Sequence, residues 1–162
     1  MPSYISELIN DKTIIGACIG ALFSIAGAFV AHGLSVRLES RKIKTSKKEE
    51  LYEELLKLKS LIAKKRSYLF LAQNDRKEDA NKLEIDKGSN IEKIVMITNL
   101  YLNCYEEYTI DIVKTYREIN LAYQDAKYNN LIFDNSQKDR IEINLSRIEV
   151  MIGRLIDNIV GG

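Results

Sequence analysis

The chain is poor in the side chains from which most metal and acid–base sites are built. Its 162 residues include one histidine, His32, and two cysteines, Cys18 and Cys104. Histidine and cysteine are the usual ligands of zinc, and histidine is the most frequent general acid or base. The P-loop, GxGxxG, GxSxG and CxxC motifs are also absent. We therefore expect no metal, no cofactor and no enzymatic activity.

Residues that interrupt helices are equally scarce. Pro2 is the only proline, and no glycine or proline occurs between Gly33 and Gly88. Apolar residues recur at helical spacings of three and four, and no pattern typical of a strand is visible. The sequence therefore predicts an all-α protein, in which one helix can continue from the apolar N-terminal stretch into the rest of the chain.

Charge is missing from residues 13–36, TIIGACIGALFSIAGAFVAHGLSV. As a helix these 24 residues would be about 36 Å long, enough to cross a hydrocarbon core of about 30 Å. A signal peptide would have a basic start and a shorter apolar core of about 7–15 residues, and an uninterrupted run above about 18 residues indicates a membrane span before a soluble core helix. We expect a single transmembrane helix over 13–36, after a short tail over 1–12.

Basic residues follow this predicted span. Residues 37–48 hold six Lys or Arg and one Glu, whereas residues 1–12 hold one Lys. Basic flanks stay in the cytoplasm, so we expect the tail outside and residues 37–162 in the cytoplasm, with the span in a bacterial inner membrane. The basic block either sets topology alone or also contacts anionic lipid head groups. The residues expected at the head groups are Arg37, Arg41, Lys42, Lys44 and Lys48.

Small residues recur at every fourth position of the predicted span, on one side of the helix. They are followed by the single histidine, and the set comprises Gly16, Gly20, Ser24, Ala28 and His32. A small-xxx-small pattern lets membrane helices approach closely, so it predicts a homo-oligomer packed through this face, although glycine-rich spans also occur without association. His32 either serves a function, such as a hydrogen bond between helices or a gate, or simply reaches the membrane interface.

Beyond the span, residues 37–162 predict a cytoplasmic, antiparallel three-helix bundle with coiled-coil character, with helices at about 37–73, 90–128 and 136–160. Two of these helices carry heptad-like apolar repeats, and Lys65 occupies a position where the first repeat expects an apolar residue. The predicted bundle seam consists of Leu51, Leu55, Leu58, Ile62, Ile141, Leu145, Ile148, Ile152, Leu155 and Ile159.

Helix starts are marked by two candidate caps. Ser89 and Glu92 form the S-x-x-E pattern of a capping box ahead of the second predicted helix. Ser136 and Asp139 suggest a second cap ahead of the third helix.

The connections between the predicted helices are polar, with one exception. Residues 73–87 are polar and predict a loop or a frayed turn. In the later connection, residues 131–133 are Leu, Ile and Phe. If the second helix folds back along the first, these residues would either lie near the head groups or close the end of the bundle.

Charge distribution and the absence of catalytic motifs leave two functional hypotheses. Residues 37–66 sum to +6 and residues 67–162 to −4, so the distal part is acidic, which argues against nucleic-acid binding. The first hypothesis is a self-associating membrane protein that acts by assembly or by binding a cytoplasmic protein. The alternative is an oligomeric membrane effector, pore-forming or depolarising, of the toxin, holin-like or phage-defence type, controlled by its helical bundle.

Overall fold

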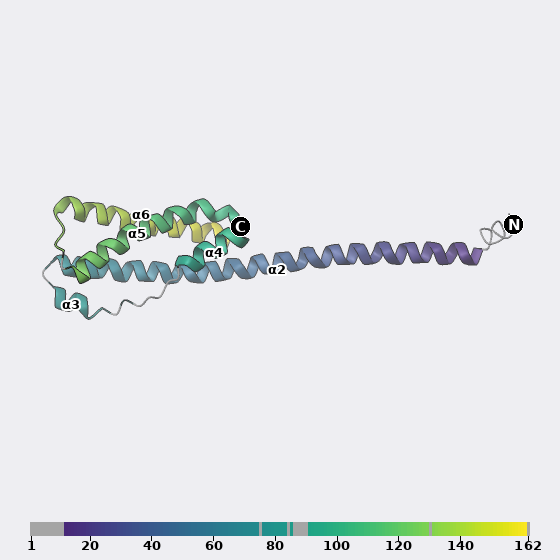
Figure 1. Cartoon of the computed structure of the whole chain (residues 1–162), viewed down its shortest axis with the longest axis horizontal. Coiled ribbons are helices and arrows are strands. Elements are labelled where there is room, and N and C mark those ends of the chain that lie inside the picture. Colours follow the sequence, from purple (N-terminus) through teal and green to yellow (C-terminus); the bar gives the residue numbers. More distant parts are fainter. Residues whose placement is uncertain (1–11, 75, 84, 86–90, 130, 162) are drawn as a thin grey trace. The chain divides into compact units, whose positions relative to one another are not determined.

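A computed structural model describes residues 12–74, 76–83, 85, 91–129 and 131–161, and within these ranges the chain forms helices and no strand (Figure 1). The protein is therefore all-α. The predicted tail over 1–12 lies outside the described residues, apart from Lys12. The elements are α2 (Lys12–Gln73), α3 (Lys77–Asn81), α4 (Ile91–Tyr101), the 3₁₀-helix η1 (Asn103–Tyr105), α5 (Glu106–Tyr128) and α6 (Asn135–Gly161).

The chain divides into two compact units, Met1–Ile43 and Lys44–Gly162. In the first unit the described residues belong to α2, and their described side chains are all exposed. By length and composition, α2 contains one stretch near the N-terminus that could cross a membrane. The candidate segment, Ile15–Gln73, includes all but the first two residues of the span predicted over 13–36.

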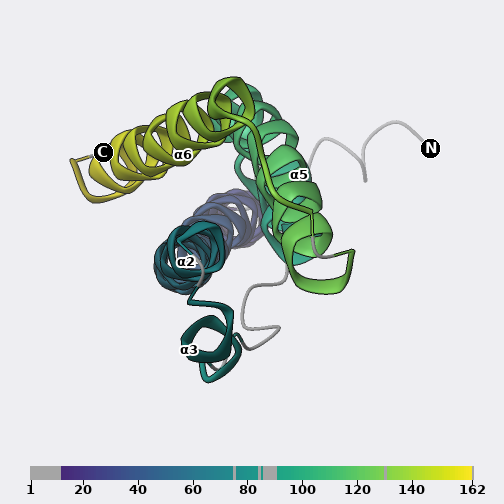
Figure 2. The ribbon, with the colours of Figure 1, turned by 90° about the vertical axis from the view of Figure 1, so that its left-hand side faces the viewer.

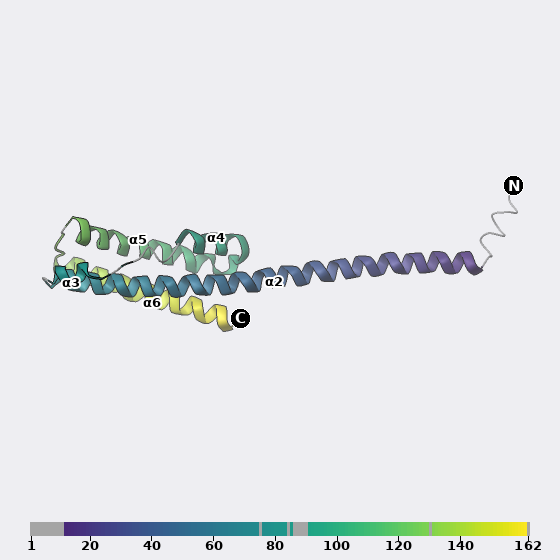
Figure 3. The same cartoon turned by 90° about the horizontal axis from the view of Figure 1, so that it is seen from below.

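The second unit has a hydrophobic core of its own. Buried side chains come from α2, α4, α5 and α6, and they form a single cluster. In Figures 1 and 3, α4, α5 and α6 lie alongside the part of α2 that belongs to this unit, and Figure 2 shows α5 and α6 on different sides of α2. The core thus depends on side chains that α2 presents in two directions.

The direction of α5 differs from the antiparallel arrangement expected from the sequence. Lys65 of α2 contacts Tyr116, and Tyr68 contacts Tyr123, so residue numbers rise together along the two helices. The helix α5 therefore runs parallel to α2. In contrast, α6 is antiparallel to α2, because Arg66 meets its first half while its last turn lines a hollow with residues of α2 near Thr45.

The single helix predicted over 90–128 is wrong, because the chain breaks at Leu102 and α4 folds back against α5. Leu102 leaves the helical conformation, with φ −134° and ψ 50°, and its side chain is buried. One turn earlier, the hydroxyl of Thr98 donates to the carbonyls of Ile94 and Val95, both at 3.0 Å. Such bonds back to the preceding turn often bend helices. This break allows α5 to run parallel to α2.

The cap of α6 also differs from the predicted pair, Ser136 and Asp139. The backbone N–H of Gln137 donates to the Asp134 carboxylate at 2.8 Å, and the N–H of Asp134 donates to the Gln137 side chain at 3.0 Å. This is the reciprocal bonding of a capping box. The other predicted cap depends on Ser89, which lies outside the described residues.

The two connections that the sequence singled out both contribute to the core. The polar stretch after Gln73 contains α3, where Ala80 is fully buried. In the connection between α5 and α6, Phe133 is buried whereas the side chain of Ile132 is 78% exposed. This connection lies at the Gln73 end of α2, where Lys138 lines the same hollow as Gln73. Phe133 therefore closes the end of the helical unit.

Candidate functional site

The small residues of the predicted span are exposed on α2. This holds for Gly16, Gly20, Ser24, Ala28 and His32. A methyl group placed on either Gly16 or Gly20 would meet nothing within 4 Å apart from the adjoining backbone of its own helix. Packing within one chain therefore does not require glycine at these positions.

The basic residues that follow the predicted span are also largely exposed. Their side chains are exposed apart from Lys48, which is half-buried, and none of the five has an ion pair within the described residues. The residues concerned are Arg37, Arg41, Lys42, Lys44 and Lys48. In contrast, the neighbouring Lys47 pairs with Glu50 at 2.6 Å and lies 5.2 Å from the centre of the Tyr101 ring.

The predicted seam residues lie together in the second unit. Nine are buried, and Ile141 is half-buried and packs against them. The buried ones are Leu51, Leu55, Leu58, Ile62, Leu145, Ile148, Ile152, Leu155 and Ile159. These residues form part of the hydrophobic core of the second unit.

Lys65, at the interrupted position of the heptad, is buried in the interface between α2 and α5. Its side chain is 3% exposed, and its ammonium donates to Asn120 Oδ1 at 2.6 Å and to the Tyr116 hydroxyl at 3.1 Å. The ammonium lies 4.6 Å from the centre of the Tyr116 ring and 5.2 Å from that of Tyr123. No carboxylate of the described residues pairs with it. Burial lowers the pKa of Lys65 to about 8.

Arg66, the next residue, binds α6 instead. One terminal nitrogen, Nη1, donates to both carboxylate oxygens of Glu149 at 3.0 and 2.9 Å, and Nη2 donates to Glu142 at 2.6 Å and to Ser146 at 3.1 Å. The Arg66 guanidinium thus makes charge-assisted hydrogen bonds to two carboxylates of α6 at once, which holds it in one position on that helix. We call Lys65, Arg66 and these partners on α5 and α6 the polar clamp. Two consecutive residues of α2 thus set the register of both neighbouring helices.

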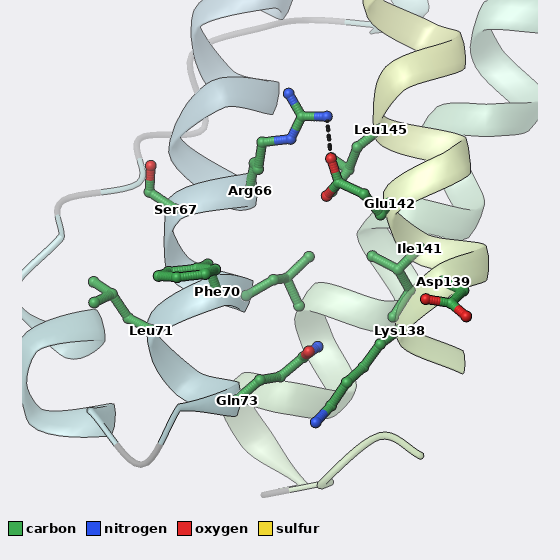
Figure 4. Close-up of a pocket in the computed structure, with 11 residues that line it drawn as sticks. Arg66, Ser67, Phe70, Leu71, Gln73, Lys138, Asp139, Ile141, Glu142 and Leu145 are labelled. Carbon is green, nitrogen blue, oxygen red and sulfur yellow. Dashed lines mark hydrogen bonds and ion pairs between the residues drawn. The ribbon is translucent and has the colours of Figure 1, made fainter. Parts of the chain in front are cut away.

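Beside the polar clamp lies a hollow of about 800 Å³ between α2 and α6. In Figure 4 side chains of the two helices face each other across it, with the Arg66–Glu142 ion pair on one side and Gln73 and Lys138 on the other. The side chain of Phe70 is 67% exposed at its edge. Its lining holds two cationic and two carboxylate side chains, so the apolar wall is the feature available to a ligand.

A second charged contact fastens α4 to α2. The ammonium of Lys93 lies 2.9 Å from Glu50 and 3.2 Å from Glu54. Burial by itself raises the pKa of Glu54, but hydrogen bonds from Lys57 and Lys93 outweigh it, and the pKa falls below its usual value. Hydrogen bonds to Glu50 and Glu54 raise the pKa of Lys93. These groups therefore stay ionised near neutral pH.

The polar clamp was not predicted from the sequence. The one available signal was Lys65 at a position where the repeat expects an apolar residue, since a lysine there either faces solvent or needs polar partners on another helix. Arg66 gives no such signal, because its partners are 76 to 83 residues away in the sequence.

Within the described residues, no group of three or more His, Cys, Asp and Glu side chains is arranged to hold a metal ion. Comparisons with protein-family models, with curated proteins and with solved structures find no match to this chain.

Proposed function

We propose that this is a single-pass membrane protein, anchored by residues 13–36, which self-associates and acts by assembly or by binding a protein, without catalysis. The observation that carries the proposal is the exposure of large apolar side chains along the N-terminal part of α2. Phe23 is 74% exposed, Phe29 73% and Leu22 67%. Apolar surface of this extent is unfavourable in water and favourable in lipid. No charged residue interrupts it.

The glycine face supports self-association as part of the same proposal. Membrane helices associate through close packing, because lipid supplies no hydrophobic force between them. Gly16 and Gly20 leave a flat strip of backbone that no atom of the same chain covers. A second copy of the span fits this strip better than a lipid chain does, because it can also pair with the Ser24 hydroxyl.

Orientation is the first testable consequence. Because residues 37–48 carry six basic side chains, we expect residues 45–162 in the cytoplasm. The residues expected near the head groups are Arg37, Arg41, Lys42, Lys44 and Lys48. A cytoplasmic reporter fused to the C-terminus should be active, and a periplasmic reporter there should be inactive. The protein should also sediment with membranes and resist extraction by carbonate. A soluble full-length protein would refute the anchor, and an active periplasmic reporter would refute the orientation.

Gly20→Leu tests the association. A leucine side chain at this position fills the strip through which two backbones would approach, while it slightly favours insertion. We expect the variant to reach the membrane but to lose its oligomer, as measured by mass in detergent. Leu22→Ala, a change on another side of the span, is the matched control and should leave the oligomer intact.

The second unit could also associate by itself, so the test includes the chain from residue 45 without the span. If that shortened chain is monomeric while Gly20→Leu keeps the oligomeric mass of the wild type, the glycine face is not the interface. If both are oligomeric, the second unit carries association, and the span serves as an anchor.

The effector alternative has one observation in its favour. The ammonium of Lys65 is buried without a carboxylate partner, and an uncompensated buried charge lowers the stability of the packed state. Such a core suits a unit that rearranges on a signal. A dye for membrane potential separates the two proposals, because overexpression of an effector would depolarise cells, whereas a scaffold would not.

A further inference from the structure

One surface of α6, opposite its buried seam, carries a regular alternation of arginine and aliphatic residues. Arg140, Ile143, Arg147, Val150 and Arg154 follow one another at spacings of three and four. The side chain of Ile143 is 65% exposed and that of Val150 is 53% exposed. We call these five residues the arginine face. Its repeat is that of a helix that packs against a second helix.

Two arginines of this face have no counter-ion in the described structure. Arg140 lies 3.8 Å from Glu118, but neither Arg147 nor Arg154 has an ion pair. Both line a hollow of about 460 Å³ between α5 and α6. The surface therefore offers two exposed guanidinium groups beside a depression.

The lining of this hollow combines apolar side chains with an excess of positive charge. Val150, Met151 and the ring of Tyr108 contribute its apolar part, and Asp111 is the one carboxylate against two arginines. The hollow between α4 and α5 differs, because its two cationic side chains face two glutamates in the same lining. An unbalanced positive charge thus distinguishes the hollow beside the arginine face from the hollow between α4 and α5.

We propose that the arginine face docks an acidic amphipathic helix of a partner protein. This inference rests on the proposed function, since it names the class of partner that the second unit binds. A helix with an aliphatic side chain for the hollow and carboxylates one or two turns away would meet Arg147 and Arg154 together. Guanidinium groups bind carboxylates in a bidentate fork, so they set the direction of the partner as well.

A lipid surface is a weaker fit for the same residues. The arginine face exposes two aliphatic side chains beside a concave hollow, whereas an interfacial helix buries a broad apolar face. Residues 44–162 contain as many acidic as basic side chains, so the unit carries no overall attraction to anionic lipid. A helical partner is therefore the occupant that the charges and the spacing favour.

The test uses the full chain in nanodiscs of zwitterionic lipid and a fluorescent peptide of about three heptads, with leucines on one face and glutamates beside them. We expect this peptide to bind and a peptide with lysines in place of the glutamates not to bind. Arg147→Glu with Arg154→Glu should weaken binding by at least about tenfold. Lys114→Glu with Arg117→Glu is the control, because it makes the same charge change at the hollow between α4 and α5 and should alter binding by less than about twofold.

Three results would overturn the proposal. They are no binding of the acidic peptide below about 1 mM, equal loss in both double variants, and binding to anionic vesicles that depends on Arg147 and Arg154 while the peptide does not bind. The nanodiscs also report whether the chain inserts and associates. If the chain inserts and associates but does not bind the peptide, only the docking proposal is refuted. If the chain does not insert, the proposed function is refuted as well.

Discussion

Replacing Ile152 with aspartate is expected to unfold the helical unit formed by Lys44–Gly162. The Ile152 side chain is fully buried in the seam of α6, so aspartate there would place a carboxylate among aliphatic groups without a partner. Such burial costs several kcal/mol, which is comparable with the whole stability of a small domain, about 5–15 kcal/mol. Circular dichroism of the full chain in mild detergent, followed during urea denaturation, should show loss of helix at low denaturant.

The same helix supplies a matched control for this experiment. Ile143→Asp makes the identical chemical change at a side chain that is 65% exposed, and we expect it to alter the free energy of unfolding by less than about 0.5 kcal/mol. Ile148→Asp, at another fully buried seam position, should resemble Ile152→Asp. Equal midpoints for Ile143→Asp and Ile152→Asp would show that the rotational setting of α6 is wrong.

The seam could be found from the sequence because its evidence is local. Isoleucine and leucine at spacings of three and four select one face of a helix, whatever that face contacts. The same reasoning identifies the apolar stretch of α2, since the absence of charge over 13–36 needs no partner to be noticed. What such patterns leave open is which helices meet and in which direction they run.

The break at Leu102 could not be predicted from local sequence patterns. Apolar residues continue at helical spacing through Tyr101, Leu102 and Tyr105, and no glycine or proline marks an end. The helix stops because Leu102 and Tyr105 are buried in the core and α4 packs back on α5. Tertiary packing here overrides helix propensity. Once that turn exists, the direction of α5 is reversed, and the antiparallel three-helix arrangement expected from the sequence no longer applies.

The polar clamp could not be predicted from the sequence for a related reason. A heptad pattern allows for one polar interruption at Lys65, but it does not say whether that side chain leaves the core or remains within it. The structure keeps it inside, where Tyr116 and Asn120 accept its hydrogen bonds from another helix. Polar residues within helical cores can fix register at a cost in stability. The same trade-off makes Lys65 the position where a substitution should raise stability.

Replacing Lys65 with methionine is expected to stabilise the second unit at pH 7, by about 1–3 kcal/mol. Methionine keeps most of the length and volume of the side chain, and it removes a buried charge that has no counter-ion. Tyr116 and Asn120 would each lose a donor, but both are half-buried, so water can take its place. Lys59→Met, at an exposed position of the same helix, is the control and should change stability by less than about 0.5 kcal/mol.

The pH dependence of unfolding distinguishes a charge effect from simple packing. The pKa of Lys65 is about 8 in the folded chain and 10.5 when it is unperturbed, so between these values the unfolded state binds more protons. Stability of the wild type should therefore rise as pH increases from 8 towards 10, at up to about 1.4 kcal/mol per pH unit. Below pH 8 the ammonium is charged in both states, and Lys65 adds no slope.

The neighbouring groups limit the useful range of pH. Burial raises the pKa of Tyr116 and of Tyr68 above the usual value of 10, so their ionisation in the unfolded state opposes the rise above about pH 10. Hydrogen bonding to Tyr123 raises the pKa of Lys127, so the titration of Lys127 also changes the stability only above about pH 10. Between pH 8 and 10, Lys65→Met should abolish the rise in stability, whereas Lys59→Met should retain it. If Lys65→Met is less stable than the wild type at pH 7 and keeps the same slope, the hydrogen bonds and ring contacts of Lys65 outweigh the cost of its burial.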